Sequence, residues 1–287
     1  MRPRWDWPRL KLRGRLFVAL GAVLVLVVAF VALFDSGWAF GLQQSESVRT
    51  GSFKPYAGMH IGEDEAGTFL VSRVAVLLGT DEIHPKGLTF NPPNSQACAV
   101  AIDHRGYFLT AGHCTSRKTI YLLLYEPPNK VTVLPARVVW RGDGSKGQPD
   151  LAILRVPAPL DFTFNVADDV HRDEPVMAVG LAFINSLTNA VILAGPQMLE
   201  LMGGHVQDCT SVAGAATDLR VATDVPLQPG DSGGALVDTH GRLVGINTLI
   251  RRVLWSRTGV AFRPNEKWLS DIIEHDAATH AHSDDRP

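Results

Sequence analysis

Short runs of apolar and β-branched residues recur along the chain from about residue 69, separated by glycine, proline, asparagine and aspartate. Runs of this length and composition predict strands, and the residues between them predict turns. Many short strands at this spacing favour a sandwich or a barrel over alternating strands and helices. The expected strands span residues 69–78, 97–102, 107–110, 119–125, 131–140, 151–156, 176–181, 190–193, 219–222, 235–237, 243–249 and 260–262.

One helix is predicted near the end of the chain, over residues 265–276. Its apolar positions fall on one helical face, and a proline directly precedes its start, where helices tolerate proline best. These positions are Trp268, Leu269, Ile272 and Ile273, after Pro264. Residues 277–287 are polar, and we expect them to form a frayed tail.

A longer apolar run lies near the N-terminus. Residues 16–34 carry no charge over 19 positions, and as a helix they would span about 28 Å, close to the thickness of a bilayer core. The preceding segment, 1–15, is strongly basic. The positive-inside rule then predicts a single-pass helix in the cell inner membrane, with a cytoplasmic N-terminus and an exported remainder. Residues 35–68, rich in glycine, serine, glutamine and glutamate, read as a linker to a domain over 69–276.

The same run also allows a cleaved signal peptide, with residues 37–39 (Gly-Trp-Ala) as a weak cleavage site. The run is longer than the usual apolar region of a signal peptide, so a retained anchor is the preferred interpretation. The alternative is a protein secreted after cleavage. In both cases the domain works in the periplasm or outside the cell.

Composition narrows the function classes. Hydrophobic residues make up 46% and charged residues 20% of the chain, which excludes a disordered protein. The net charge is -2 and the isoelectric point about 6.5, so no electrostatic footprint for nucleic acid is present. Three cysteines are too few for a disulfide scaffold or an all-cysteine zinc site. We expect no metal and no cofactor.

Three segments carry candidate chemistry: 110–114 (Thr-Ala-Gly-His-Cys), 150–154 (Asp-Leu-Ala-Ile-Leu) and 230–234 (Gly-Asp-Ser-Gly-Gly). Each alone has an ordinary structural explanation, as a packed histidine, a turn aspartate or a glycine turn. Together they supply a base, a carboxylate and a nucleophile. Serine needs an imidazole to take its proton, and the imidazole needs an acceptor to fix its tautomer. Glycines beside the serine let backbone N–H groups converge on an oxyanion.

These segments resemble those of the trypsin-like (chymotrypsin-fold) serine proteases. Residues 223–234, 241–248 and 259–262 are similar to the bacterial HtrA/Deg-like branch, and the likeness covers about residues 70 to 275. It implies an all-β fold of two six-stranded antiparallel β-barrels with a C-terminal helix, here preceded by the transmembrane helix. By position it implies His113 as general base, Asp150 as its orienting carboxylate and Ser232 as nucleophile. The backbone N–H groups of Gly230 and Ser232 would form the oxyanion hole.

Three features depart from the HtrA pattern. About 25 residues remain after Phe262, so no PDZ domain is expected. Residue 231 is aspartate where HtrA proteins usually have asparagine; we expect an internal partner for it rather than a new N-terminus cut at Arg73–Val74. Cys98 and Cys114 resemble a disulfide of the animal enzymes, and export favours that bridge over two reduced thiols.

The family likeness also suggests where the S1 pocket, which binds the substrate side chain before the cut bond, would lie. Its candidate residues precede the serine or lie on the strand after it: Val225, Pro226, Leu227, Gly245, Ile246 and Asn247. The position that carries an acid in trypsin is Pro226, so a cationic side chain would lack a counter-charge. Small or medium aliphatic side chains fit better, although the direction of the Asp224 side chain is left open.

The sequence therefore predicts a membrane-anchored serine endopeptidase that cuts protein or peptide substrates through an acyl-enzyme. The alternative is a non-catalytic, protease-like binding module tethered to the membrane. An intact set of three catalytic groups argues against the alternative. The sequence does not fix the oligomeric state.

Overall fold

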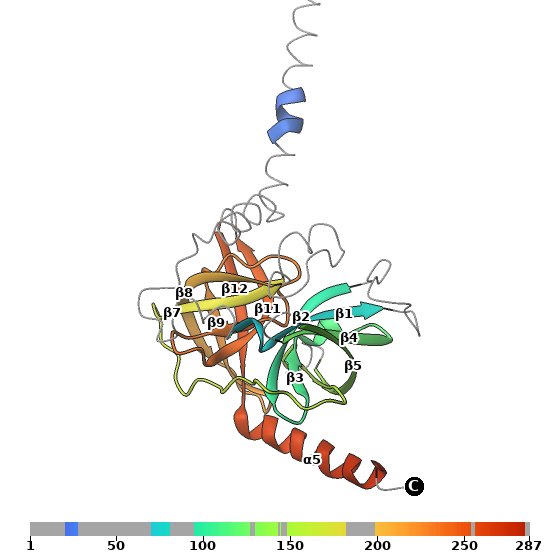
Figure 1. The fold of residues 1–287 in the computed structure, drawn as a ribbon. Helices are drawn as coiled ribbons and strands as arrows, with labels where there is room; N and C mark the ends of the chain where they lie inside the picture. The colour runs from blue at the N-terminus through green and yellow to red at the C-terminus, as the bar shows by residue number, and fades with distance from the viewer. Residues whose placement is uncertain are drawn as a thin grey trace, which may run out of the picture.

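The computed structural model describes residues 21–27, 70–80, 95–126, 130–142, 144, 148–181, 199–253 and 256–284. Within these ranges, strands build two closed six-stranded antiparallel barrels, and a C-terminal helix follows them (Figure 1). The expected barrels and terminal helix are thus confirmed.

The first barrel holds the strands up to residue 155, in the spatial order β1-β2-β3-β6-β5-β4. Pairing of β4 with β1 closes it, with Val76 opposite Leu123. Closure leaves no open sheet edge to template aggregation. Its strands are β1 (Val74–Thr80), β2 (Ser95–Asp103), β3 (Tyr107–Thr110), β4 (Thr119–Glu126), β5 (Lys130–Arg141) and β6 (Ala152–Arg155).

The second barrel has the order β10-β11-β12-β9-β8-β7 and closes through β10 and β7, where Leu236 lies opposite Ala178. The long strand β8 pairs with β7 along its first part and with β9 along its second part. Its strands are β7 (Pro175–Leu181), β8 (Leu199–Ser211), β9 (Thr217–Thr223), β10 (Ala235–Val237), β11 (Leu243–Val253) and β12 (Ser256–Pro264).

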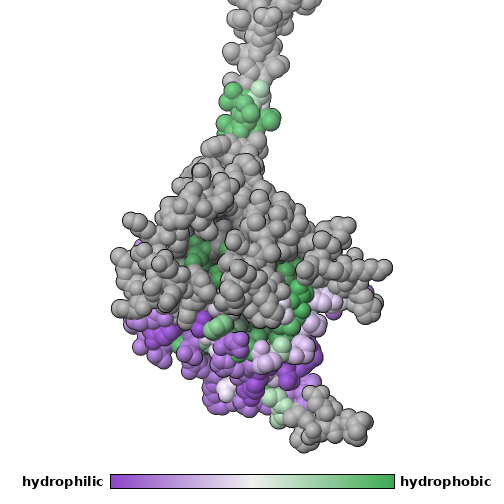
Figure 2. All heavy atoms as spheres, viewed as in Figure 1, coloured by the Kyte–Doolittle hydropathy of each residue, from purple (hydrophilic) through white to green (hydrophobic). Residues whose placement is uncertain are grey.

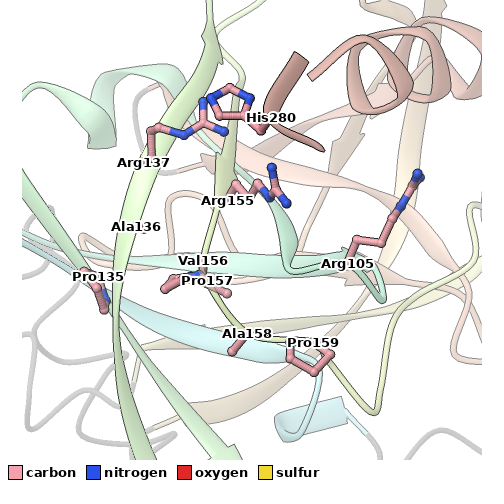
Figure 3. Close-up of a pocket in the computed structure, with 10 residues that line it drawn as sticks. All are labelled: Arg105, Pro135, Ala136, Arg137, Arg155, Val156, Pro157, Ala158, Pro159 and His280. Atoms are coloured by element: carbon pink, nitrogen blue, oxygen red, sulfur yellow. The ribbon is translucent and has the colours of Figure 1, made fainter. Parts of the chain in front are cut away.

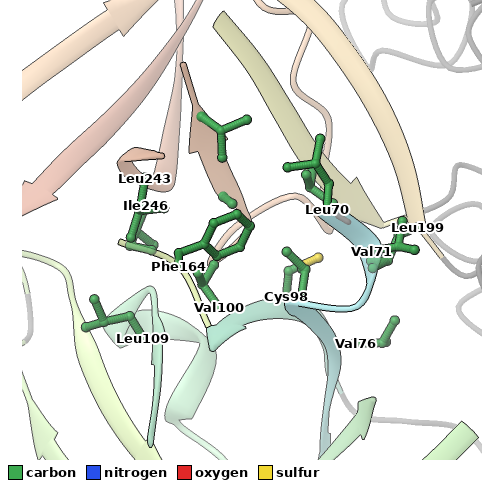
Figure 4. Packing of buried hydrophobic residues seen from close by; sticks show 14 of the residues in the cluster. Leu70, Val71, Val76, Cys98, Val100, Leu109, Phe164, Leu199, Leu243 and Ile246 are labelled. Atoms are coloured by element: carbon green, nitrogen blue, oxygen red, sulfur yellow. The ribbon is translucent and has the colours of Figure 1, made fainter. Parts of the chain in front are cut away.

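Three apolar clusters stabilise the domain: one inside each barrel and one between the barrels. Strand alternation divides β2 between two of them. Ala97 and Ala99 face the interior of the first barrel, whereas Cys98 and Val100 face the second barrel. Figure 4 shows this inter-barrel cluster, in which Phe164 from the connection between the barrels lies near Cys98. The two barrels are therefore packed as one unit.

Helix α5 (Glu266–Asp284) spans from the second barrel to the first. The Asn265 Oδ1 accepts the Trp268 N–H at 2.9 Å and caps the helix start. Leu269 and Ile273 enter the inter-barrel cluster, and the ring of Trp268 stands edge-on to that of Trp140. Hydrophilic residues predominate on the visible face around the helix (Figure 2).

The helix is longer than expected. Residues 277–284 continue it instead of forming a frayed tail. This stretch contains three alanines and neither glycine nor proline, so nothing in it stops a helix that is already started.

Two strand predictions need correction. The first strand begins at Val74 rather than residue 69, because Leu70 and Val71 are helical. The strand β8 was not predicted, since a Gly-Gly pair and several polar residues interrupt its apolar pattern. The strand expected at 190–193 lies outside the described residues.

Little of the N-terminal prediction falls in the described ranges. Residues 21–27 are helical, while the rest of the expected membrane segment and the linker 35–68 lie outside them. Among the residues that the structure describes, no helix has both the length and the apolar character needed to span a bilayer.

Candidate active site

Neighbouring strands of the first barrel bring His113 and Asp150 together. Thr110, at the end of β3, pairs with Ala152, at the start of β6. His113 follows β3 in the short 3₁₀ helix η1 (Gly112–Thr115), and Asp150 directly precedes β6. Antiparallel neighbours place these two chain ends side by side, although they are far apart in sequence.

Asp150 holds the histidine through two hydrogen bonds. Its Oδ1 accepts the His113 backbone N–H at 2.8 Å, and its Oδ2 lies 2.6 Å from ring Nδ1. Gly112 permits this approach, because a Cβ there would lie 2.9 Å from Asp150 Oδ1 and would also collide with the Gly142 carbonyl. The pair leaves the imidazole Nε2 as the nitrogen available for proton transfer.

The two groups shift each other's proton affinity. The hydrogen bond to Asp150, with a smaller contribution from Cys114, raises the pKa of His113 above 6.5. Burial alone raises the pKa of Asp150, but the hydrogen bonds and charge of His113 outweigh burial and lower that pKa below 3.8. Each group thus favours the charged form of the other. An imidazolium formed during a reaction would be stabilised in this position.

The serine lies in a tight turn between β9 and β10. The Gly234 N–H donates to the Asp231 carbonyl at 2.9 Å, which closes the turn around Ser232. Gly233 has a φ of 82°, a left-handed conformation that few other residues adopt. A Cβ at Gly233 would also collide with the Cys98 carbonyl and the Thr110 hydroxyl.

Backbone hydrogen bonds dock this turn onto both barrels. The Cys98 N–H donates to the Ser232 carbonyl at 2.9 Å, which joins the turn to β2 of the first barrel. The Gly233 N–H donates to the Asn247 carbonyl at 2.6 Å, which joins it to β11 of the second. The serine turn therefore lies beside Thr110, three residues before the histidine. Within the described part of the chain no hydrogen bond joins His113 to Ser232.

The side chain of Asp231 is almost fully buried beside the serine, with 1% exposure. Its Oδ2 accepts the Gln228 N–H at 2.8 Å, and its Oδ1 accepts the Leu181 N–H at 3.1 Å. Val74 lies within β1, opposite Val100, as part of a continuous strand. In this structure the carboxylate is thus held by internal backbone groups.

The expected disulfide is not formed: Cys98, Cys114 and Cys209 are all free thiols. The reason is the alternation of β2. Cys98 faces the inter-barrel cluster (Figure 4), where its Sγ lies 3.6 Å from the Gly230 carbonyl oxygen, whereas Cys114 packs inside the first barrel. The two side chains lie on opposite sides of the barrel wall.

The candidate S1 residues do not share one environment. Val225 and Leu227 pack inside the second barrel, and Ile246 packs in the inter-barrel cluster. Gly245 and Asn247 are buried as well, and Pro226 is half-buried. Most of these residues are therefore buried in the core rather than presenting side chains to solvent. The Asp224 carboxylate turns toward β8, where it accepts the His205 N–H at 2.5 Å.

Residues 97–246, just over half of the chain, match the family model of the trypsin-like peptidase domain. The chain belongs to this family. Among curated trypsin-like relatives, a probable periplasmic serine endoprotease DegP-like from Rhizobium meliloti is 27% identical over 197 residues, covering 68% of this chain and 36% of the relative. The chloroplastic Protease Do-like 1 of Arabidopsis thaliana is 32% identical over 150 residues, covering 50% of this chain and 31% of the relative.

Solved structures of trypsin-like proteases show the same fold. The serine endoprotease from Yersinia pestis aligns with a TM-score of 0.53 at 18% identity, covering 78% of this chain and 67% of that one. The HtrA-type protease AlgW with a decapeptide aligns with a TM-score of 0.53 at 22% identity, covering 75% and 68%. The curated relatives, which are named as DegP-like and Do-like proteases, confirm the predicted resemblance to the HtrA-like branch. The chain spans about a third of the length of the curated relatives described above.

Sequence reasoning named the three candidate catalytic side chains but missed what holds the serine turn. Its hydrogen bonds to Cys98 and Asn247 use only backbone atoms, so no side-chain motif signals them. The Thr110 hydroxyl, which donates to the Cys98 carbonyl at 2.7 Å, belongs to the histidine motif and was the one available signal.

Proposed function

We propose that the protein is a serine endopeptidase that uses His113, Asp150 and Ser232 as a catalytic triad. The observation that carries this proposal is the double hydrogen bond between Asp150 and His113, at 2.8 and 2.6 Å. It fixes the imidazole with Nδ1 toward the carboxylate, which is the orientation that a general base for serine requires.

In the proposed reaction, His113 Nε2 takes the proton of Ser232 Oγ as that oxygen attacks the peptide carbonyl carbon. The imidazolium then gives the proton to the leaving amine, which leaves an acyl group on Ser232. Water, activated by the same imidazole, releases the acid and restores the serine. The absence of a His113–Ser232 hydrogen bond among the described residues is compatible with this role, because catalytic hydrogen bonds often tighten only when substrate binds.

The N–H groups of Gly230 and Ser232 are the proposed oxyanion hole. Within the described part of the chain, neither N–H donates a hydrogen bond, whereas those of Asp231, Gly233 and Gly234 are all engaged. Two unused donors beside the nucleophile are what a developing oxyanion needs.

The proposed substrates are proteins or peptides with a small or medium aliphatic side chain at the cleaved position. Asp224 lies on the surface and binds the backbone of β8, so it supplies no buried counter-charge for a cationic side chain. Leu249, on the strand after the serine, is 57% exposed and offers an apolar contact. Hydrolysis of alanine- and valine-containing peptides should exceed that of lysine or arginine analogues.

We further propose that residues 16–34 anchor the protease in the inner membrane and that the domain acts in the periplasm or outside the cell. Relatives named as periplasmic support the compartment. Cell fractionation tests the anchor: the protein should stay with membranes in high salt and be released by detergent. Release into the soluble periplasmic fraction after loss of the N-terminal segment would favour the cleaved alternative.

The proposed enzyme is active as synthesised. The Asp231 carboxylate already has internal partners in Gln228 and Leu181, so no new α-amino group is required to neutralise it. Protein with the Arg73–Val74 bond intact should hydrolyse substrate. Activity that begins only after a cut at this bond would refute this part of the proposal.

A fluorophosphonate probe tests the catalytic role directly, since it reacts with an activated serine. We expect labelling of Ser232, loss of labelling in Ser232→Ala and near-complete loss in His113→Ala. Ser211→Ala is a matched control, because Ser211 lies at the exposed end of β8. A correctly folded protein that takes up no probe would instead be a non-catalytic binding module.

A further inference from the structure

A cavity of about 660 Å³ lies on the first barrel, remote from the candidate active site. It opens beside the pair formed by Tyr107 and Arg155, at one end of β3 and β6. His113 and Asp150 lie beyond the opposite end of the same two strands, where Thr110 pairs with Ala152. The volume falls in the range of small-molecule binding sites, and no step of the proposed peptidase reaction uses it.

One side of this cavity is apolar and poor in hydrogen-bond donors. Residues 157–159 (Pro-Ala-Pro), which follow β6, line it together with Pro135 and Ala136 of β5 (Figure 3). Proline has no N–H to offer a ligand. This wall therefore suits a hydrocarbon body rather than a polar one.

The other side is cationic. Arg137 and Arg155 project from β5 and β6, and His280 projects from α5 (Figure 3). The two arginines share one carboxylate, Asp276, which is 9% exposed and lies behind them. In the part of the chain that the structure describes, Arg137 and Arg155 together face only the single carboxylate of Asp276. Arg105, which also lines the cavity, is paired with Asp103 and Glu274.

The arginine donors are only partly used. Arg137 binds Asp276 through Nη2 alone, at 2.8 and 3.1 Å. Arg155 approaches Asp276 no closer than 3.6 Å, and its guanidinium lies over the Tyr107 ring. Within the described residues, the Arg155 guanidinium donates no hydrogen bond. The Arg155 side chain is 29% exposed. Its planar guanidinium can donate two parallel hydrogen bonds to the two oxygens of a carboxylate or phosphate.

Arg105, also at the cavity, is different. Its guanidinium is engaged with Asp103 and Glu274 at 2.8 and 2.9 Å. Anchoring of α5 to the first barrel accounts for Arg105 and for one nitrogen of Arg137. It does not account for the open donors of Arg155 or for the apolar wall opposite them.

We propose that this cavity binds an amphiphilic anion, a small molecule with a hydrocarbon body and a carboxylate or phosphate head. The head is bound by Arg155 and Arg137, and the body lies along residues 157–159. The site is separate from the peptidase centre, so its occupation does not depend on the proposed catalytic role.

Isothermal titration of octanoate into the full chain tests the proposal, with Ser232→Ala in the background to prevent self-cleavage. Octanoate should bind saturably and at least about tenfold more tightly than neutral octanamide, because a charge-assisted arginine contact distinguishes the two. Octyl phosphate and inorganic phosphate are the other two arms. The first identifies the preferred head group, and the second should bind more weakly than octyl phosphate because it lacks the body.

Three variants separate the parts of the site. Arg155→Gln should weaken octanoate binding about tenfold, since it removes the open fork without touching the hydrogen bonds of Asp276. Ala158→Phe fills the apolar side and should weaken binding while keeping the cations. Arg172→Gln, which removes the same charge from an exposed turn outside the cavity, should change the affinity less than twofold. Unchanged melting temperatures would show that the variants fold.

A photoreactive diazirine analogue of octanoate locates the bound ligand. Cross-linked peptides should come from residues 130–141 and 152–160. The proposal is overturned if neither octanoate nor octyl phosphate binds saturably, if Arg155→Gln binds as tightly as the parent protein, or if the cross-links map elsewhere.

Discussion

Replacing Asp150 by asparagine is the sharpest test of the proposed active site, because it changes charge while keeping shape. The carboxylate accepts both the backbone N–H and the Nδ1 of His113. An amide can keep the backbone bond through its oxygen but then turns its NH₂ group toward the ring. Because the NH₂ group donates a hydrogen bond, Nδ1 of the imidazole must be unprotonated and accept it. The ring proton then sits on Nε2, the atom that has to accept the serine proton.

The magnitude follows from these two losses. A hydrogen bond to a charged group contributes about 1.5–3 kcal/mol, and His113, with 49% of its side chain exposed, belongs near the low end of that range. The wrong tautomer adds a larger penalty, since the base must first rearrange. Together we expect kcat/KM to fall by roughly 10³- to 10⁴-fold, which corresponds to about 4–5.5 kcal/mol.

The pH profile gives an independent readout. The base works only when deprotonated, and Asp150 raises the pKa of His113 above 6.5. The acidic limb of kcat/KM for the parent protein should therefore lie above pH 6.5, with activity rising as the pH increases through it. In Asp150→Asn the residual activity should show this limb at lower pH.

Peptide hydrolysis measured across pH 5 to about 10 for both proteins provides the assay. Asp169→Asn is the matched control, since Asp169 is an exposed acid in the connection between β6 and β7. It should behave like the parent protein. An Asp150→Asn variant that keeps activity within threefold, or whose limb does not move, would refute the role of Asp150.

Three further predictions concern folding and the thiols. Gly233→Ala should lower activity at least about tenfold, because its φ of 82° and its contact with Cys98 leave no room for Cβ. Gly241→Ala, at a φ of 73° in a distant turn, carries the backbone strain without that collision, so it should cost less stability and keep activity. Equal activity in both variants would contradict the docking argument. Thiol titration of the unfolded, unreduced protein should find three free thiols. Finding only one would show that Cys98 and Cys114 form the disulfide after all. Asp276→Asn should destabilise the fold by about 2–4 kcal/mol, since it weakens the contacts with Tyr107 and Arg137. Because the folded pKa of Asp276 lies below 3.8, this contribution should be complete above about pH 4 and shrink as the pH falls below 3.8 toward the folded pKa. A difference in unfolding free energy between parent and variant that does not shrink at all below pH 3.8 would count against it.

The barrels were predictable because their strands are short, apolar and bounded by turn residues. The predicted 107–110 and 235–237 coincide with β3 and β10. The strand β8 was not predictable in this way, because it contains Gly203 and Gly204 and runs into polar residues. Its pairing with β7 and β9 decides its conformation, and such tertiary contacts override local preference.

In the candidate site, the pairing of His113 with Asp150 was predictable, whereas the backbone contacts that hold the serine turn were not. His113 and Asp150 lie together as the motifs implied, whereas the implied bridge between Cys98 and Cys114 failed on strand alternation. Sequence resemblance transfers a residue type to a position. It does not transfer the direction in which that side chain points, which depends on the register of β2.

The proposed catalytic groups come from different barrels, so their mutual position depends on how the barrels pack. His113 and Asp150 are fixed to each other within the first barrel, while Ser232 belongs to the second. The hydrogen bond from the Cys98 N–H to the Ser232 carbonyl is a direct link between the two halves. The Cys98 side chain enters the inter-barrel cluster from the same residue. A substitution that enlarges or shrinks this cluster should therefore alter the distance from the serine to the histidine without touching either one. Such a variant should show a lower kcat even under conditions where it remains fully folded.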